Sequence, residues 1–336
     1  MPMLDHLEQR AAVVGIAGPS LAREEAALFA THPPVGIILF RRNIQTPAQL
    51  LSLTTSIREC IGADASILVD QEGGRVARLR PPLWPAFPPV AAFEGQVAEA
   101  AFESAAAMGS VCNAAGIDVV CAPVVDLRVA GAHDVIGDRA FSADPNEVAR
   151  LGHAVVAGLR HSGCVPVMKH IPGHGRALAD SHEALPVVTA ATDVLGRDVI
   201  PFQSLAGAGV WAMTAHILYP AWDADHCATF SRRIIDEVVR GEIGFDGVLI
   251  TDDLAMGALA GLADRRAGSA LDAGCDLVLH CTGMIAETRS LLVDCPRVTE
   301  RSAQRIIAAR CRGTTGAANW PIGPFARSDD PTARAP

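Results

Sequence analysis

The sequence has no apolar run as long as the ~18 residues that a membrane-spanning helix requires. Its nine cysteines include no C-x-x-C pair and no spacing typical of a zinc cluster, so we expect reduced thiols and no metal site. Basic residues are outnumbered by acidic ones, 28 Lys and Arg against 37 Asp and Glu, so the formal net charge of the 336 residues is −9. This charge repels nucleic acids and anionic membranes, so neither is an expected partner, and a small, largely uncharged substrate fits better.

The hydrophobic content is 50%, which supports a large core. It excludes a mainly disordered chain and is enough for one large α/β barrel or for two ordinary domains. Near the N-terminus, the apolar stretch 11–17 follows Arg10 and resembles the core of a signal peptide. Acidic Asp5 and Glu8 precede it, however, and Gly18-Pro19-Ser20 follows as a turn, so we interpret it as a first barrel strand in a cytoplasmic protein.

Short β-rich runs recur between longer stretches of helical periodicity, a pattern typical of repeated βα units. Eight such units predict a closed (β/α)8 barrel of the TIM type, in a single domain. A doubly wound open sheet is the competing fold. Its first strand should be followed by a Gly-rich phosphate-binding turn, and Gly15–Ser20 does not match that motif. The predicted strands are Ala12–Ala17, Val35–Phe40, Ser66–Asp70, Ile117–Pro123, Val165–His170, Val210–His216, Val248–Asp252 and Asp276–His280.

Helices are expected between these strands. After about Cys311 the composition changes to Gly, Pro, Thr, Ala and charged residues. We therefore predict a catalytic barrel over residues 1–311 and a tail over residues 312–336, flexible or packed on the barrel. The predicted helices are Ala22–Ala30, Pro47–Cys60, Val97–Ala115, Asn146–His161, Thr192–Gly207, Arg232–Ile243 and Gly257–Ala273.

Polar residues end several of the predicted strands. In a barrel of this kind the C-terminal ends of the strands form the catalytic face, so these residues are the first candidates for a site. Any one of them alone is more often a cap or a local ion pair, but ionisable groups that converge on one mouth favour a function. They are Asp70 with the following Gln71–Arg78, then Asp126, Lys169, His170, His216, Asp252, Asp253 and His280.

The segment Lys169–Gly175 reads Lys-His-Ile-Pro-Gly-His-Gly, and Asp180-Ser181-His182 follows it. Its two glycines and its proline prevent a helix and predict a mobile loop directly after a strand, where functional residues are common. Asp180 and His182 are two positions apart, which in an extended segment points both side chains to one side, so the carboxylate would orient the imidazole. A solvated turn with a helix cap is the alternative interpretation, as an N-cap is for Asp252.

These motifs together resemble the bacterial β-N-acetylhexosaminidases of glycoside hydrolase family 3, the small single-barrel type associated with peptidoglycan recycling. The Lys-His-x-Pro-Gly-His-Gly element with its downstream Asp-Ser-His is highly specific, and Asp-Gln-Glu-Gly-Gly-Arg adds moderate support. That family usually has Phe after the Lys-His pair, whereas this chain has Ile171. The matching segments are 35–43, 70–78, 137–141, 169–186 and 251–256.

The resemblance implies a monomeric, cofactor-free retaining β-N-acetylglucosaminidase that removes terminal β-1,4-linked N-acetylglucosamine from peptidoglycan fragments, namely GlcNAc-anhydroMurNAc and its peptides. It implies that Asp252 is the nucleophile, that His182 is the general acid/base and that Asp180 is its partner. An imidazole titrates near ~6.5, so it can donate a proton and then accept one near neutral pH. The residues expected to hold the sugar are Asp70, Arg78, Arg139, Lys169 and His170.

Three other functions remain open at this stage. Lys169 ends a strand and fits a Schiff-base aldolase, in which a desolvated lysine attacks a carbonyl. His170 and His174 are four positions apart and, with Asp252, fit a metal-dependent hydrolase, although Pro172 interrupts the helix that this spacing needs. The third possibility is a barrel that binds sugar without turning it over.

Overall fold

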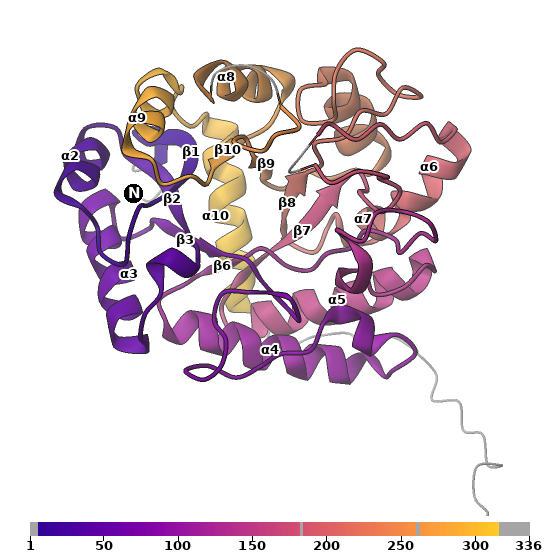
Figure 1. Ribbon diagram of the computed structural model, residues 1–336, viewed down its shortest axis with the longest axis horizontal. Helices are drawn as coiled ribbons and strands as arrows, with labels where there is room; N and C mark the ends of the chain where they lie inside the picture. Colours follow the sequence, from indigo (N-terminus) through magenta and orange to yellow (C-terminus); the bar gives the residue numbers. More distant parts are fainter. Residues whose placement is uncertain (1–5, 182–183, 260–262, 316–336) are drawn as a thin grey trace, which may run out of the picture.

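The protein is described by a computed structural model that covers residues 6–181, 184–259 and 263–315. Eight parallel strands close into a barrel in the order β1-β10-β9-β8-β7-β6-β3-β2, and helices surround it (Figure 1). The predicted (β/α)8 barrel is confirmed, and the doubly wound open sheet is wrong. The strands are β1 (Arg10–Gly15), β2 (Pro34–Leu39), β3 (Ser66–Val69), β6 (Val119–Val120), β7 (Val165–Ile171), β8 (Trp211–Thr214), β9 (Leu249–Asp253) and β10 (Leu277–His280).

Each predicted strand is present, and its bounds differ by a few residues at most from the apolar run that predicted it. All seven residues of β7 are buried, as expected for a strand covered by side chains of the barrel interior on one face and by helices on the other. β1 pairs with β2 on one side and with β10 on the other, which closes the sheet. The stretch interpreted as a first strand rather than a signal-peptide core therefore lies within the barrel wall.

A short antiparallel hairpin follows β3 and carries the Asp-Gln-Glu-Gly-Gly-Arg motif. It consists of β4 (Gln71–Gly73) and β5 (Val76–Ala77). Gly73 at the end of β4 and Gly74 in the turn have φ values of 93° and 56°, a region that favours glycine. A Cβ atom on Gly73 would lie 2.2 Å from the Pro88 carbonyl oxygen, so this position has no room for a side chain.

Most predicted helices match their segments. The exceptions have local causes: Pro201, whose nitrogen carries no hydrogen, separates α6 from α7 within the predicted Thr192–Gly207 helix, and residues 257 and 258 of the predicted Gly257–Ala273 helix form a turn. The sequence pattern did not predict α9 or α10. The helices are α2 (Arg23–Thr31), α3 (Pro47–Ile61), α4 (Ala98–Ala114), α5 (Pro145–His161), α6 (Thr192–Asp198), α7 (Ile200–Leu205), the π-helical η4 (Ile234–Glu242), α8 (Ala263–Ala273), α9 (Ile285–Asp294) and α10 (Glu300–Thr315).

Helix α10 lies at the N-terminal ends of the strands. Its Arg305 donates to Asp276, which precedes β10, and its Arg310 donates to Asp118, which precedes β6. The helix continues past the predicted boundary at residue 311, and the rest of the predicted tail, residues 316–336, lies outside the described residues. α10 therefore belongs to the barrel domain.

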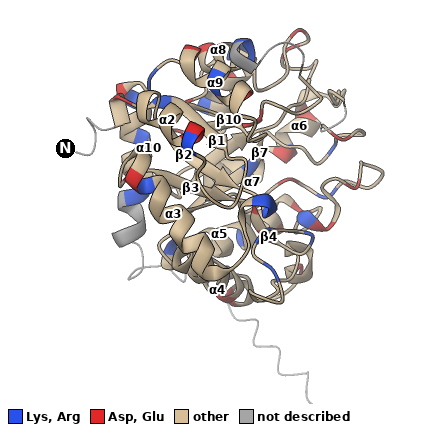
Figure 2. Ribbon diagram, turned by 60° about the vertical axis from the view of Figure 1, so that its left-hand side comes forward, with Lys and Arg blue, Asp and Glu red and all other residues tan. Residues whose placement is uncertain are grey.

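Charged residues of both signs are scattered over the loops and helices in the view of Figure 2. Within residues 6–181, 184–259 and 263–315, we find no helix with the length and apolar character needed to cross a bilayer. The eight cysteines whose side chains are described are free thiols, and seven of these are buried.

Candidate active site

A cavity of about 310 Å³ opens at the C-terminal ends of the barrel strands. Six of the predicted site residues line it: Asp70, Arg78, Arg139, Lys169, His170 and Asp252. It is lined by charged residues that follow β3 or lie on the hairpin and β7, and by apolar residues from β2, β8 and β10. The further lining residues are Glu72, Arg75, Val76, Val135, Ile136, His174, Ser181, Asp253, Met256, Cys281, Ile38, Phe40, Met213 and Leu279.

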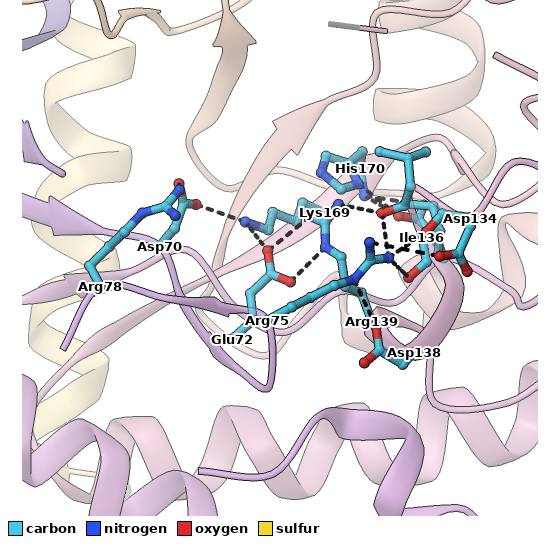
Figure 3. Close-up of polar contacts among 12 residues, drawn as sticks. Asp70, Glu72, Arg75, Arg78, Asp134, Ile136, Asp138, Arg139, Lys169 and His170 are labelled. Carbon is cyan, nitrogen blue, oxygen red and sulfur yellow. Dashed lines mark hydrogen bonds and ion pairs between the residues drawn. The ribbon is translucent and has the colours of Figure 1, made fainter. Parts of the chain in front are cut away.

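An ion-pair network at this cavity centres on Lys169, the only lysine in the chain. Its Nζ lies 2.9 Å from Asp70 Oδ1 and 2.6 Å from Glu72 Oε1 (Figure 3). Arg78 completes the network on the other side of Asp70, with Nη2 3.0 Å from Oδ2. The ring of Phe40 packs beneath the Arg78 guanidinium, whose carbon lies 5.4 Å from the ring centroid. Asp70, Lys169 and Arg78 thus come together as predicted.

Glu72 links Lys169 to Arg139. It lies in the candidate segment Gln71–Arg78 but was not among the residues expected to hold the sugar. Arg139 Nε and Nη2 donate to Glu72 Oε2 and Oε1 at 2.8 and 2.9 Å, a bidentate pair with fixed geometry. The Glu72 side chain is only 3% exposed. The signal that could have identified Glu72 is its position in the motif directly after the third strand, where its side chain turns back toward the barrel mouth.

Mutual compensation keeps these groups charged. Burial by itself would raise the pKa values of Asp70 and Glu72, but Lys169 and the neighbouring arginines lower both below their ordinary values. Burial likewise opposes the charge on Lys169, yet Asp70 and Glu72 raise its pKa above the ordinary value. A permanently protonated amine is not a nucleophile, so this geometry disfavours the Schiff-base alternative.

Arg75, at the tip of the hairpin, holds the loop that carries Arg139. Its Nε donates to Asp138 at 2.8 Å, and its Nη2 donates to the carbonyl oxygens of Val135 and Ile136 at 3.1 and 3.2 Å (Figure 3). Hairpin and loop are thus tied reciprocally, since Arg139 of the loop binds Glu72 of the hairpin. Sequence reasoning did not identify this role of Arg75.

Asp252 lies near the end of β9, partly exposed to the cavity, as expected for a residue at the mouth of the barrel. The backbone N–H of Asp253 donates to its Oδ1 at 2.8 Å. Burial would raise the pKa of Asp252, but the neighbouring His170 and His216 rings and this hydrogen bond lower it below its ordinary value. The carboxylate is therefore ionised at neutral pH, the state that a nucleophile requires.

Asp253 differs from its neighbour, because burial and the charge of Asp252 raise its pKa. Its Oδ1 accepts the backbone N–H groups of Ala255 and Cys281, both at 3.0 Å, so it joins the loops after β9 and β10. His216 donates from Nε2 to the carbonyl oxygen of Asp253 at 3.1 Å. These contacts fix the backbone beside Asp252, so Asp253 is a loop-organising residue as well as a lining one.

The loop after β7 is fixed in its first half. A Cβ atom on Gly175 would lie 1.9 Å from the Leu127 carbonyl oxygen, so only glycine fits there. Arg176 donates to Asp198 through two bonds of 2.6 and 3.0 Å, and the hydroxyl of Tyr219 donates to the Gly173 carbonyl oxygen at 2.8 Å. These contacts anchor the first half of the loop to its neighbours, and the predicted mobility of the loop stays a prediction.

The second half of the loop contains the predicted acid/base pair. His182 lies outside the described residues. Asp180 is partly exposed, and Ala184 N donates to its carbonyl oxygen at 3.1 Å. The extended arrangement predicted for Asp180 and His182 stays a prediction. Ser181 lines the cavity together with Asp252 and is held by His174, whose Nε2 lies 3.2 Å from its Oγ. The residue that precedes His182 therefore shares a cavity with Asp252.

The other polar residues at strand ends have structural partners. His280 lies 3.0 Å from Thr282 Oγ1 and 3.3 Å from Glu287, and Asp126 is fully buried against His170 and the loop after β7. Across the residues that the structure describes, no three His, Cys, Asp or Glu side chains form a group suited to a metal ion. His170 directs Nδ1 to Asp126 and meets His174 ring edge to face, at 5.4 Å between centroids.

Comparison with known proteins places this geometry in a family. Residues 5–308 match the family described as glycosyl hydrolase family 3 N terminal domain. A protein from Alkalilimnicola ehrlichii named beta-hexosaminidase is 43% identical over 280 residues, 80% of each chain, and one from Bordetella avium with the same name is 42% identical over 282 residues, covering 80% of this chain and 79% of the relative.

Solved structures agree. A glycoside hydrolase family 3 beta-N-acetylglucosaminidase from Paenibacillus sp. superposes with a TM-score of 0.83 at 33% identity, over 92% of this chain, which spans 62% of that protein. Native NagZ from Neisseria gonorrhoeae superposes with a TM-score of 0.77 at 32% identity, over 94% of this chain and 99% of that one. The similarity therefore covers nearly the whole barrel.

Proposed function

This chain belongs to glycoside hydrolase family 3, and from that membership and the cavity we propose a retaining β-N-acetylglucosaminidase that acts through Asp252, His182 and Asp180. A glycoside hydrolase needs one group to stabilise the anomeric carbon and another to move a proton. The observation that carries the proposal is the ionised Asp252 carboxylate, which opens into the same cavity as Ser181 and the Asp70–Lys169 network.

Asp252 attacks the anomeric carbon while His182 donates a proton to the departing oxygen, which gives a covalent glycosyl-enzyme intermediate. The neutral imidazole then takes a proton from water, the water attacks the same carbon, and the bond to Asp252 breaks with the β configuration retained. Asp180 orients the imidazole and stabilises its cation. The hydrogen bonds that link Ser181 to His174 and to Ala258 N support this assignment, because they tie the residue before His182 to the loop after Asp252.

The ion-pair network holds the sugar in the proposed complex. Asp70 accepts hydrogen bonds from sugar hydroxyls, and Lys169, Arg78 and Arg139 donate them. Because each cation already contacts a carboxylate, its direction is fixed before substrate binds, which lowers the entropic cost of binding. His170 offers the remaining ring nitrogen from the adjacent strand position.

The proposed substrate is a peptidoglycan fragment with a terminal β-1,4-linked N-acetylglucosamine, such as GlcNAc-anhydroMurNAc and its peptides, processed in the cytoplasm during cell-wall recycling. The names of the relatives support the N-acetylglucosaminide part of this proposal. This chain covers 99% of NagZ from Neisseria gonorrhoeae, which supports the assignment to the small members of the family. We further propose that the enzyme acts as a monomer.

A chromogenic N-acetyl-β-glucosaminide tests the activity, with the matching β-glucoside and N-acetyl-β-galactosaminide in parallel. We expect hydrolysis of the first and slow or undetectable hydrolysis of the other two. Proton NMR of the released sugar should show the β anomer first, since two displacements retain configuration. Release of the α anomer first would exclude a covalent Asp252 intermediate.

The role of His182 has its own test. His182→Ala should slow hydrolysis by the ~10²–10⁴-fold expected for loss of general acid-base catalysis, but less for substrates with an acidic leaving group, which departs without a proton. Equal losses with activated and unactivated leaving groups would contradict the assignment. Failure of every sugar substrate in the wild-type enzyme would instead favour a binding barrel without turnover.

A further inference from the structure

Asp126 makes three kinds of contact with β7 and the loop that follows it, although the proposed mechanism does not use it. Its side chain is completely buried in the segment that follows β6. Asp126 Oδ2 lies 2.7 Å from His170 Nδ1, and both carboxylate oxygens lie 3.2 Å from the His170 backbone N–H. Oδ1 also accepts the backbone N–H of His174 at 2.6 Å. One carboxylate therefore fixes both the ring and the backbone of a cavity-lining histidine.

The chemistry of these contacts determines where the proton of His170 resides. Burial would raise the pKa of Asp126, but the His170 ring and the hydrogen bonds from His170 and His174 lower it below the ordinary value. An ionised carboxylate only accepts hydrogen bonds. His170 Nδ1 must then carry a hydrogen in both the neutral and the cationic ring, which leaves Nε2 as the nitrogen that gains or loses a proton.

His170 lines the cavity, and its Nε2 is the ring nitrogen that can face a ligand there. Within the described part of the chain, the ring's hydrogen bonds go to Asp126 through Nδ1, and its edge contact is with His174. His174 is uncharged at neutral pH, because burial and the proximity of His170 lower its pKa to about 4. The charged residues that line the same cavity are Asp252, Lys169, Asp70, Glu72, Asp253, Arg75, Arg78 and Arg139.

We propose that Asp126 is a positioning residue that keeps the proton of His170 on Nδ1, so that His170 presents Nε2 to the sugar as a hydrogen-bond acceptor beside Asp252. A neutral ring with a free Nε2 lone pair accepts a sugar hydroxyl, whereas the other tautomer would direct an N–H there. The identity of the sugar rests on the proposed function, but the tautomer does not.

Nitrogen NMR on histidine-labelled wild-type enzyme tests the tautomer directly. Long-range proton–nitrogen correlations distinguish a protonated from an unprotonated ring nitrogen, and His170→Gln identifies the signals of this residue among the 11 histidines. We expect a protonated Nδ1 and an unprotonated Nε2 at neutral pH. A neutral ring protonated at Nε2 would overturn the proposal, and this measurement needs no Asp126 variant.

Asp126→Asn then tests the cause. If its side-chain oxygen keeps the hydrogen bond from His174 N–H, its NH2 group faces His170 Nδ1, and a neutral ring must move its proton to Nε2. We expect the NMR pattern to invert and kcat/KM for the chromogenic N-acetylglucosaminide to fall by about 10- to 100-fold, since the sugar hydroxyl loses its acceptor and must reorient to accept from Nε2–H instead. An unchanged tautomer or unchanged kcat/KM would overturn the proposed role.

Asp198→Asn is the matched control. Asp198 is also a buried carboxylate that anchors the loop after β7, through Arg176, but it does not line the cavity. This variant should lower Tm and leave the His170 signals and kcat/KM near those of the wild type. Equal kinetic losses in the two variants would reduce Asp126 to a structural anchor. Absence of wild-type hydrolysis would defeat the proposed function, while the NMR pattern would still decide the tautomer.

Discussion

Carboxylates are buried at both ends of the barrel, but their oxygens are used differently. At the N-terminal ends of the strands, Asp276 accepts from Leu249 N and Arg240 through Oδ2 and from Ser302 and Arg305 through Oδ1, at 2.7 to 2.9 Å. At the C-terminal ends, the partners of Glu72 are Lys169 and Arg139, which also line the cavity.

The difference separates stability from function. The donors around Asp276 come from β9, η4 and α10 and enclose its carboxylate. Its ion pairs with Arg240 and Arg305 therefore hold η4 and α10 to the strands. The donors around Glu72 have one side open, and their remaining hydrogen-bonding capacity can be met by a ligand. A buried ion pair alone is weak evidence for either role, and the adjoining cavity is what distinguishes the two ends.

The largest expected effect is a loss of activity on substitution at the C-terminal ends of the strands. Asp252→Asn should lower kcat on the chromogenic N-acetylglucosaminide by about 10⁴-fold or more, because the amide cannot form the glycosyl bond. Its Tm should stay close to that of the wild type, since Asp252 is partly exposed. A kcat within tenfold of the wild-type value would remove Asp252 from the mechanism.

Matched amide substitutions sharpen the comparison. Asp276→Asn should destabilise the fold by about 3–5 kcal/mol, because Arg240 and Arg305 lose their buried counter-charge, and should leave kcat/KM of the folded enzyme unchanged. Glu72→Gln should destabilise the fold too, and should in addition lower kcat/KM by about 10²-fold, since Arg139 and Lys169 lose their direction. Urea unfolding and steady-state kinetics measure the two effects. Similar kinetic losses in both variants would break the distinction between the ends.

His174, at the C-terminal end of the barrel, should contribute to the pH dependence of stability. Folded His174 has a pKa of about 4, below the ~6.5 of an unfolded chain, so the unfolded state binds the proton first as pH falls. Its contribution is complete above about pH 6.5 and is lost toward pH 4, by up to roughly 3 kcal/mol. His174→Gln should therefore flatten the curve of unfolding free energy against pH in this window. Parallel curves for the two proteins would contradict the assignment.

The smallest expected effect concerns exposed arginines. Arg75→Ala should raise KM a few-fold with little change in kcat, because the loop that delivers Arg139 loses its clamp. Arg301→Ala, at the opposite end, removes an exposed pair with Asp246 and should change stability by less than about 1 kcal/mol and KM not at all. An unchanged KM in Arg75→Ala would show that Glu72 alone positions Arg139.

The strands and most of the cavity-lining residues were predictable for a physical reason. Parallel strands buried on both faces appear as short apolar runs, and the polar residue that ends such a run reaches the mouth of the barrel. Asp70, Lys169, His170 and Asp252 all follow this rule and line the cavity. Helix α10 was not predicted, and its hydrogen bonds to the barrel, from Ser302, Arg305 and Arg310, go to partners that are distant in sequence.

The contacts between particular side chains were harder to predict from the sequence. Glu72 and Arg75 lie in a predicted motif, yet the loop that binds both of them is about sixty residues away along the chain. The contact between His174 and Ser181 is local, but it depends on a turn that the spacing of residues does not specify. The roles of Asp180 and His182 remain predictions.

The amino-acid sequence by itself determined the barrel and the set of polar groups at its mouth, because alternation between buried strands and amphipathic helices is a local property of the chain. Tertiary structure decided which carboxylate contacts which cation, and which of these pairs faces an open cavity. The reason is that burial, hydrogen bonding and pKa depend on distances between residues such as Asp126 and His170, which only the closed barrel brings together.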